Sequence, residues 1–107
     1  MKKLLIVSST KNSNLELSNK IEDFLGNKNE LSCKVVSLED FRLPLYTPTL
    51  EIEYKNKDSF PENIEKVKNL ICDSNALIWC SPEYNGGISP IVTNAIAWIS
   101  RATKDWK

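Results

Sequence analysis

Histidine is the first residue type that this sequence lacks, since none occurs in its 107 residues. Its absence removes the commonest general base and every Ser-His or Cys-His nucleophile pair. Three cysteines are present, Cys33, Cys72 and Cys80, and none belongs to a Cys-x-x-Cys motif. Zinc sites usually take four Cys or His ligands, so we expect no metal site and interpret the cysteines as buried thiols. If the chain is an enzyme, a cofactor must supply its chemistry.

Net charge and long apolar runs are lacking too. The 14 basic residues balance 14 acidic ones, and they form no cluster of the kind that binds nucleic acid. No run approaches the roughly 20 apolar residues of a membrane span. The apolar start is too short for a secretory signal and has no small-residue cleavage site. We therefore expect one cytoplasmic domain, residues 1–107, that contacts neither nucleic acid nor a membrane.

The apolar residues that are present alternate between two patterns. Short continuous runs, typical of strands buried on both faces, lie at residues 3–8, 33–38 and 75–81. Helical spacing follows each run, at residues 14–26, 59–74 and 89–101. This alternation predicts an α/β fold with right-handed crossovers and a parallel sheet covered on both faces. The segment 39–60 contains Pro44 and Pro48, and we expect it to be a long loop.

A polar turn, residues 8–14, follows the first predicted strand. Ligands of open parallel sheets bind beyond the carboxyl ends of the strands. This turn offers hydroxyl groups, backbone N–H groups at a helix N-terminus and the cation of Lys11, which together suit a phosphate dianion. It has neither the glycine pattern of a nucleoside-triphosphate loop nor that of a dinucleotide site. A plain helix cap by Ser13 or Asn14 fits the local sequence equally well.

A second turn, residues 82–87, follows the third predicted strand. Pro82 stiffens it, and Gly86 and Gly87 permit positive φ and a close approach of the backbone. Its amides and carbonyls suit the polar edge of a flat heterocycle, and Tyr84 could cover the ring face. Spacing alone favours the simpler interpretation, an ordinary strand-to-helix turn with an exposed tyrosine.

Residues 81–101, SPEYNGGISPIVTNAIAWISR, resemble the signature of the NADPH-dependent FMN reductase family, flavodoxin-like enzymes that include azo-, quinone- and chromate-reducing members. The matching residues are Pro82, Glu83, Tyr84, Asn85, Gly86, Pro90, Asn94, Ala95, Ile96, Trp98, Ser100 and Arg101. The turn at residues 8–14 matches less closely. Ser8 replaces the family's glycine, and Lys11 replaces its arginine, which keeps the charge but loses the bidentate fork.

The resemblance implies a flavodoxin-like three-layer sandwich with a parallel sheet. The family's sheet has strand order 2-1-3-4-5, and the resemblance covers its first part. We therefore expect a partial domain of about three strands and three helices, without strands four and five. The resemblance also implies FMN as cofactor, and no side chain of the chain is assigned a catalytic role. The residues that would hold the phosphate are Ser9, Lys11, Ser13 and Asn14. Those that would line the isoalloxazine ring, largely through backbone, are Pro82, Glu83, Tyr84, Asn85 and Gly86.

By the same resemblance, hydride would pass from NADPH or NADH to FMN and then to a small electron acceptor such as a quinone. The third strand would lie at a sheet edge, and such an edge calls for a partner strand. Together with the family habit, this predicts a homo-oligomer, either a dimer or a tetramer. The alternative is a non-catalytic, truncated flavodoxin-like module that self-associates and binds no flavin.

Overall fold

A parallel sheet lies at the centre of the computed structural model, which describes residues 2–26, 31–57, 60–84 and 86–102. Its strands, in the order β2-β1-β3, are β1 (Lys2–Ser8), β2 (Leu31–Ser37) and β3 (Ala76–Cys80). The helices are α1 (Ser13–Gly26), α2 (Pro48–Asn56), α3 (Glu62–Cys72) and α4 (Pro90–Ala102). Shorter elements are the 3-10 helix η1 (Leu38–Asp40) and the strands β4 (Glu83–Tyr84) and β5 (Gly87–Ile88).

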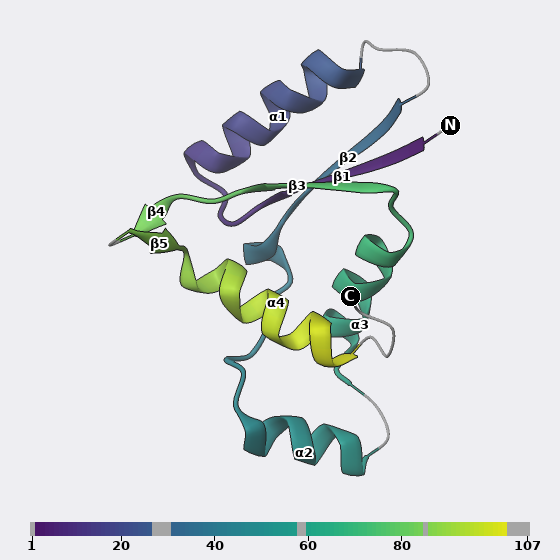
Figure 1. Ribbon diagram of the computed structural model, residues 1–107, viewed down its shortest axis with the longest axis vertical. Coiled ribbons are helices and arrows are strands. Elements are labelled where there is room, and N and C mark those ends of the chain that lie inside the picture. Colours follow the sequence, from purple (N-terminus) through teal and green to yellow (C-terminus); the bar gives the residue numbers. More distant parts are fainter. Residues whose placement is uncertain (1, 27–30, 58–59, 85, 103–107) are drawn as a thin grey trace.

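Helices cover both faces of the sheet, with α1 on one face and α3 and α4 on the other (Figure 1). The central strand β1 explains this arrangement, because its apolar side chains alternate between the faces. Leu4 and Ile6 pack in the cluster that includes α1, while Leu5 and Val7 pack in the cluster formed with α3 and α4. All four are buried. The α/β flavodoxin-like sandwich expected from the sequence is confirmed.

The strand register places the ends of all three strands at one level. Ser8, the last residue of β1, pairs with Ser37 of β2 on one side and with Cys80 of β3 on the other. The three following connections therefore leave the same edge of the sheet. This is the carboxyl edge, where open parallel sheets bind their ligands.

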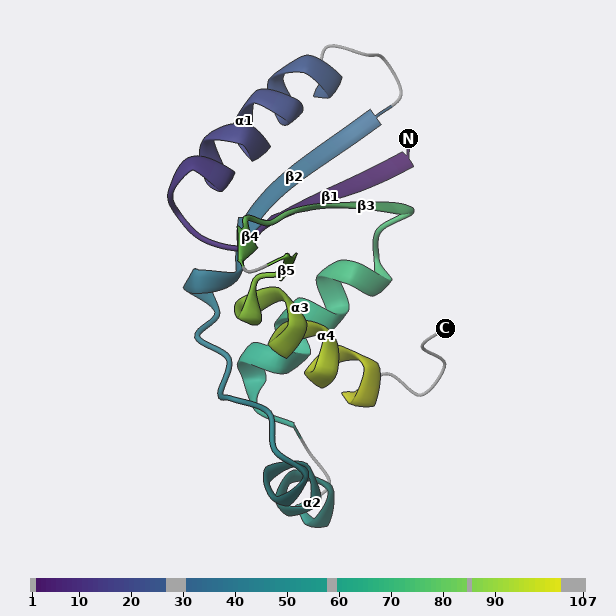
Figure 2. The same ribbon diagram turned by 60° about the vertical axis from the view of Figure 1, so that its left-hand side comes forward.

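The prediction of a long loop at residues 39–60 is wrong, since this segment contains most of η1 and the whole of α2. Thr47 caps α2 by accepting the Leu50 N–H at 3.1 Å, and Pro48 stands at the first helical position, where proline is favoured. The helix was missed because it buries no residue and so shows no apolar stripe. The chain thus has four α-helices within the described ranges rather than about three. Figure 2 shows α2 away from the sheet, beyond α3 and α4.

Hydrogen bonds from α4 hold the connection between η1 and α2. The Pro44 carbonyl accepts the Asn94 side-chain amide at 2.9 Å and the Trp98 indole N–H at 2.7 Å, and the Tyr46 N–H donates to Asn94 at 2.7 Å. Trp98 is fully buried. The rings that surround its indole, at centroid distances of 5.1 to 6.2 Å, belong to Tyr46, Tyr54 and Phe60. Two residues of the family signature, Asn94 and Trp98, therefore serve the architecture.

The expectation of buried thiols holds for Cys80. It is wrong for Cys33, which is partly exposed, and for Cys72, the last residue of α3, which is exposed. No helix in the described ranges combines the length and apolar character that a membrane crossing needs.

Glu51 of α2 lies at the centre of a polar network that also involves α4. The Tyr46 hydroxyl donates to Glu51 at 2.5 Å, Lys55 lies 2.8 Å from the carboxylate, and the Arg101 Nε lies 3.3 Å from it. The Arg101 guanidinium also lies over the Tyr46 ring, 4.4 Å from its centroid. Lys55, followed by Tyr46, holds the pKa of Glu51 below its usual value, and the Glu51 carboxylate raises the pKa of Tyr46.

Replacing Trp98 by Phe tests the anchoring of the connection to α4. The variant Trp98→Phe keeps an aromatic ring but removes the indole donor and some buried volume. We expect a loss of about 2 kcal/mol in the free energy of unfolding, measured by urea denaturation. The control Ile52→Ala changes a side chain of α2 that is 59% exposed and should cost less than about 0.5 kcal/mol. Equal losses in the two variants would contradict the anchoring role.

Acid should remove the stabilisation that the Glu51 network provides. Since the folded-state pKa of Glu51 is lowered, its contribution is complete above the ordinary pKa of a glutamate and is lost as pH falls through the lowered value. Wild type should therefore be more stable than Glu51→Gln at about pH 7, and the difference should shrink by about pH 3. Urea denaturation of both proteins at the two pH values measures this. A difference that is constant with pH would exclude the carboxylate as its source.

Candidate functional site

The two turns singled out in the sequence begin side by side. The backbone N–H of Ser9, just after β1, donates to the carbonyl of Cys80, the last residue of β3, at 2.9 Å. Figure 1 shows the start of α1 and the β4–β5 hairpin at the same end of the sheet. The residues predicted for the phosphate and those predicted for the ring therefore belong to one region, at the carboxyl edge of the sheet.

Ser9 is the most informative residue of the first turn. Its side chain is completely buried, and its hydroxyl has no hydrogen-bond partner among the described residues. Buried hydroxyl groups nearly always have a partner, and a missing one requires an explanation. The neighbouring Ser8 hydroxyl, by contrast, donates to the Thr10 carbonyl at 2.5 Å. An acceptor brought by a ligand would satisfy Ser9.

Ser13 and Asn14 form the first turn of α1, as the phosphate prediction requires. The carbonyl of Asn12 accepts the first backbone hydrogen bonds of the helix, from Leu15 and Glu16. Within the part of the chain that the structure describes, neither the Ser13 nor the Asn14 side chain accepts from a backbone N–H. The interpretation of these two residues as plain helix caps is therefore not supported. Helix N–H groups that lack a partner of this kind suit an anion.

Lys11, the predicted cation, already has acidic partners. Its ammonium group forms an ion pair with Asp40, and its backbone N–H donates to the Glu39 carboxylate at 2.9 Å. The hydrogen bond and the charge of Asp40 raise the pKa of Lys11. Sequence reasoning missed both carboxylates. The available signal was their position directly after the second predicted strand, which ends beside the first.

The second turn is a hairpin at the backbone level, which the sequence did not predict. Glu83 pairs with Ile88 and Tyr84 with Gly87 in an antiparallel register. Gly86 has a φ of +80°, so a side chain there would be strained even though open space surrounds it. The predicted site residue Asn85 lies outside the described residues.

Two serines that sequence reasoning missed close the base of this hairpin. The Ser89 N–H donates to the Ser81 hydroxyl at 3.2 Å, and the two hydroxyl oxygens lie 3.0 Å apart. They join the end of β3 to the start of α4. A hollow of about 290 Å³ lies beside them, and its lining consists of Ser81, Pro82, Gly86, Gly87 and Ile88. Two of the predicted ring-binding residues, Pro82 and Gly86, thus line one hollow.

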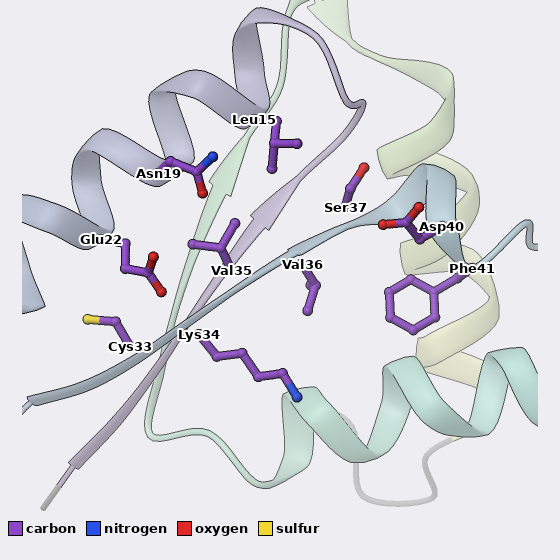
Figure 3. A pocket seen from close by; sticks show the side chains of 10 residues that line it. All are labelled: Leu15, Asn19, Glu22, Cys33, Lys34, Val35, Val36, Ser37, Asp40 and Phe41. Atoms are coloured by element: carbon purple, nitrogen blue, oxygen red, sulfur yellow. The ribbon is translucent and has the colours of Figure 1, made fainter.

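A larger hollow, of about 500 Å³, lies elsewhere, between α1 and the outer edge of β2 (Figure 3). Leu15, Asn19 and Glu22 line it from α1, and Figure 3 shows their side chains on the side of β2 that faces the helix. It contains none of the predicted site residues. Because it follows the side of an edge strand rather than the carboxyl ends of strands, its position is not that of a cofactor site in this fold class. Asp40, which lines its end, connects it to the first turn.

The fold and the two adjacent turns define an α/β protein of the flavodoxin-like class. Comparison with known proteins then identifies the family. The chain belongs to the NADPH-dependent FMN reductase family, whose sequence pattern matches residues 1–107. The family resemblance inferred from the signature is confirmed.

Individual relatives give the extent of the similarity. The uncharacterized protein MG342 homolog of Mycoplasma pneumoniae is 29% identical over 102 residues, which are 94% of this chain and 55% of that protein. An NADPH:quinone oxidoreductase of Arabidopsis thaliana is 31% identical over 64 residues, which are 60% of this chain and 31% of that protein.

A solved structure shows the same fold at low sequence identity. The NAD(P)H:(acceptor) oxidoreductase FerB of Paracoccus denitrificans, a flavoenzyme, matches with a TM-score of 0.72 and 22% identity. The match covers 94% of this chain and 51% of that protein. The chain thus spans about half the length of this structure and of the Mycoplasma relative.

The described residues fit the cofactor that the family name implies. The buried Ser9 hydroxyl without a partner and the start of α1 suit a phosphate group. The positive φ of Gly86 and the hollow beside it leave room for a flat ring close to the backbone. Among the described residues, no group of three or more Cys, Asp or Glu side chains is arranged to hold a metal ion.

The unpartnered Ser9 hydroxyl leads to a prediction about stability without ligand. Replacing Ser9 by Ala removes a buried polar group that makes no hydrogen bond, so the free energy of unfolding should stay unchanged or rise by up to about 1 kcal/mol. The matched control is Ser18→Ala. Ser18 is equally buried, but its hydroxyl donates to the Asn14 carbonyl at 2.8 Å.

Chemical denaturation of the two variants separates these cases. Ser18→Ala should lose about 1 kcal/mol, because it breaks a hydrogen bond that is made. A loss in Ser9→Ala as large as that in Ser18→Ala would show that the Ser9 hydroxyl has a partner in the ligand-free protein. The site would then lose its strongest indication of a ligand.

Proposed function

We propose that this chain binds FMN in its two adjacent turns and acts as an NAD(P)H-dependent flavin reductase that passes electrons to a small acceptor such as a quinone. The observation that carries the proposal is the buried Ser9 hydroxyl, which has no hydrogen-bond partner among the described residues. The backbone N–H of the same residue donates to the carbonyl of Cys80, the last residue of β3, and the second turn follows directly after this strand. Family membership and the name of the Arabidopsis relative support it.

In this proposal the first turn holds the phosphate. The Ser9 hydroxyl and the N–H groups at the start of α1 would donate to phosphate oxygens, with Ser13 and Asn14 adding their side chains. The Lys11 ammonium would contribute charge. The dipole of the 14-residue helix α1 favours an anion at this end. The first turn would therefore orient the phosphate end of the cofactor and neutralise its charge.

The second turn would place the isoalloxazine ring. Pro82, Glu83, Tyr84, Asn85 and Gly86 would line it, mainly through backbone amides and carbonyls. Ile88, which is 62% exposed next to the hollow, offers apolar surface to the ring. When bound, FMN supplies the redox chemistry, taking hydride from NADPH or NADH and giving electrons to the acceptor. The chain's residues bind and orient, in keeping with its lack of histidine.

The open edge of the sheet favours a second candidate function. β3 pairs with β1 on one side, and among the described residues no strand lies on its other side. Leu77, Ile78 and Trp79 of this strand are partly exposed. An edge of this kind invites a partner strand. A non-catalytic module that self-associates through β3 as a dimer or tetramer, without flavin, would satisfy it.

A flavin titration separates the two candidates. The purified chain is titrated with FMN, followed by flavin fluorescence and visible absorbance, and its mass is measured by size-exclusion chromatography with light scattering. The reductase proposal expects a saturable spectral change, then loss of the visible band on anaerobic addition of NADPH or NADH and its return on addition of a quinone. An unchanged flavin spectrum at high protein concentration, from a chain that forms a defined oligomer, would favour the non-catalytic module.

Two glycine substitutions, one in the second turn and one control elsewhere, test whether this turn binds the flavin ring. Gly86→Ala forces a residue with a Cβ into a positive φ, at a cost of about 1–2 kcal/mol to the turn conformation. If that conformation binds the ring, FMN affinity should fall about tenfold. The control is Gly26→Ala at the end of α1, where an added Cβ meets open space without a positive φ. Equal FMN affinities of the two variants would contradict the binding of the isoalloxazine ring by this turn.

A further inference from the structure

Two carboxylates meet the first turn from a neighbouring element. Glu39 and Asp40 belong to η1, which follows β2 directly. The Glu39 carboxylate accepts the backbone N–H of Lys11 at 2.9 Å, and Asp40 pairs with the ammonium group of the same residue. One lysine is thus bound at both its backbone donor and its charged end by two acids that lie 28 and 29 positions further along the chain.

The strand register and the cap of η1 bring the two acids next to the first turn. Parallel pairing sets Ser37 opposite Ser8, which brings η1 alongside the first turn. Ser37 also caps η1, since its hydroxyl accepts the Glu39 N–H at 3.3 Å. Leu38 between them is buried, with 1% of its surface exposed. The acids are therefore presented to Lys11 by a capped and anchored turn.

The donors that these carboxylates use are donors that a phosphate would use. A phosphate dianion at the start of a helix takes backbone N–H groups and a nearby cation. At Lys11 both are already paired with negative oxygens. A dianion placed there would also face the repulsion of Glu39 and Asp40. The Ser9 hydroxyl, in contrast, is buried and has no partner among the described residues. The turn therefore has one donor that is not paired, the Ser9 hydroxyl, and two that carboxylates occupy, the backbone N–H and the ammonium group of Lys11.

The pairs are weak enough to be exchanged. Both Lys11 and Asp40 are more than half exposed, at 55% and 54% of their side-chain surface. Exposed ion pairs contribute little to stability because water competes for both partners and salt screens them. Hydrogen bonds from a lysine ammonium to a phosphate and to a carboxylate belong to the same charge-assisted class, so one can replace the other at little net cost. Exchange of a carboxylate for a phosphate at Lys11 is therefore energetically accessible, but it must be made before Lys11 can contribute to binding.

We propose that Glu39 and Asp40 are internal competitors for the anion site of the first turn, and that they set its affinity for a phosphate group by occupying Lys11. The inference rests on the proposed function and names the residues that tune it. A ligand without a phosphate does not need Lys11, so its binding is insensitive to the two acids. The acids thus limit the advantage that FMN has over riboflavin.

The experiment first uses inorganic phosphate as the probe. Phosphate is titrated into wild type, Glu39→Gln, Asp40→Asn and the double variant, and the amide signals of Lys11 and Ser13 are followed by ¹⁵N NMR. The control is Glu62→Gln, which removes the same charge from an exposed pair with Lys66 on α3. We expect the Kd for phosphate to fall about threefold to tenfold in each single variant and further in the double variant, with Glu62→Gln like wild type.

Two results would overturn the inference. One is a phosphate Kd that is unchanged or higher in Glu39→Gln and Asp40→Asn. The other is the absence of phosphate binding to any of the proteins, since the turn would then have no anion site to compete for. A gain that appears equally in Glu62→Gln would assign it to net charge and would count against the two acids as well.

Parallel titrations with FMN and riboflavin keep this inference separate from the proposed function. If the charge variants bind phosphate more tightly but none binds either flavin, the competitor role stands and the flavin function fails. If both flavins bind and the ratio of their affinities is the same in wild type and in Glu39→Gln, the flavin function stands and the competitor role fails. Both stand if the variants tighten FMN binding and leave riboflavin binding unchanged.

Discussion

The two-sided parallel pairing of β1 is the constraint on which the rest of the structure depends. Because Ser8 pairs with both Ser37 and Cys80, three strands end in one row, and the three segments that follow them emerge next to one another. These segments are the first turn, the 3-10 helix η1 and the β4–β5 hairpin. They are far apart in the sequence, and the strand register alone makes them neighbours.

The long signature shared with the family combines two kinds of residue. Its first part forms the hairpin, with the positive φ of Gly86. Its second part lies on α4, where Asn94 and Trp98 bind the carbonyl of Pro44 and Arg101 reaches the Glu51 network. The described contacts of this second part are architectural, since they fix the connection that carries α2. A motif can therefore indicate a family strongly although several of its residues serve the architecture.

The sequence predicted the elements that carry strong patterns. Apolar runs and helical spacing located the three sheet strands and the helices α1, α3 and α4, because these elements bury apolar faces. Helix α2 buries none, and only its cap, Thr47 followed by Pro48, indicated it. The hairpin strands have two residues each, too few for a pattern to appear.

The site was predictable in part for the same reason. The two turns follow strand ends, which a sequence can locate, and hydroxyls, a cation and glycines in them indicate their chemistry. The contacts of Lys11 with Glu39 and Asp40 depend on the register between β1 and β2 and on the cap of η1. The buried state of the Ser9 hydroxyl depends on packing around the turn. Neither is encoded in any local pattern.

We propose one flavin site that both turns form at the carboxyl edge of the sheet. Mapping amide chemical shifts in ¹⁵N NMR spectra as FMN is added to the chain tests it most directly. The largest changes should appear together in residues 9–14 and 81–89. Changes confined to one turn, or centred on Cys33 and Val35 in the hollow beside β2, would contradict it.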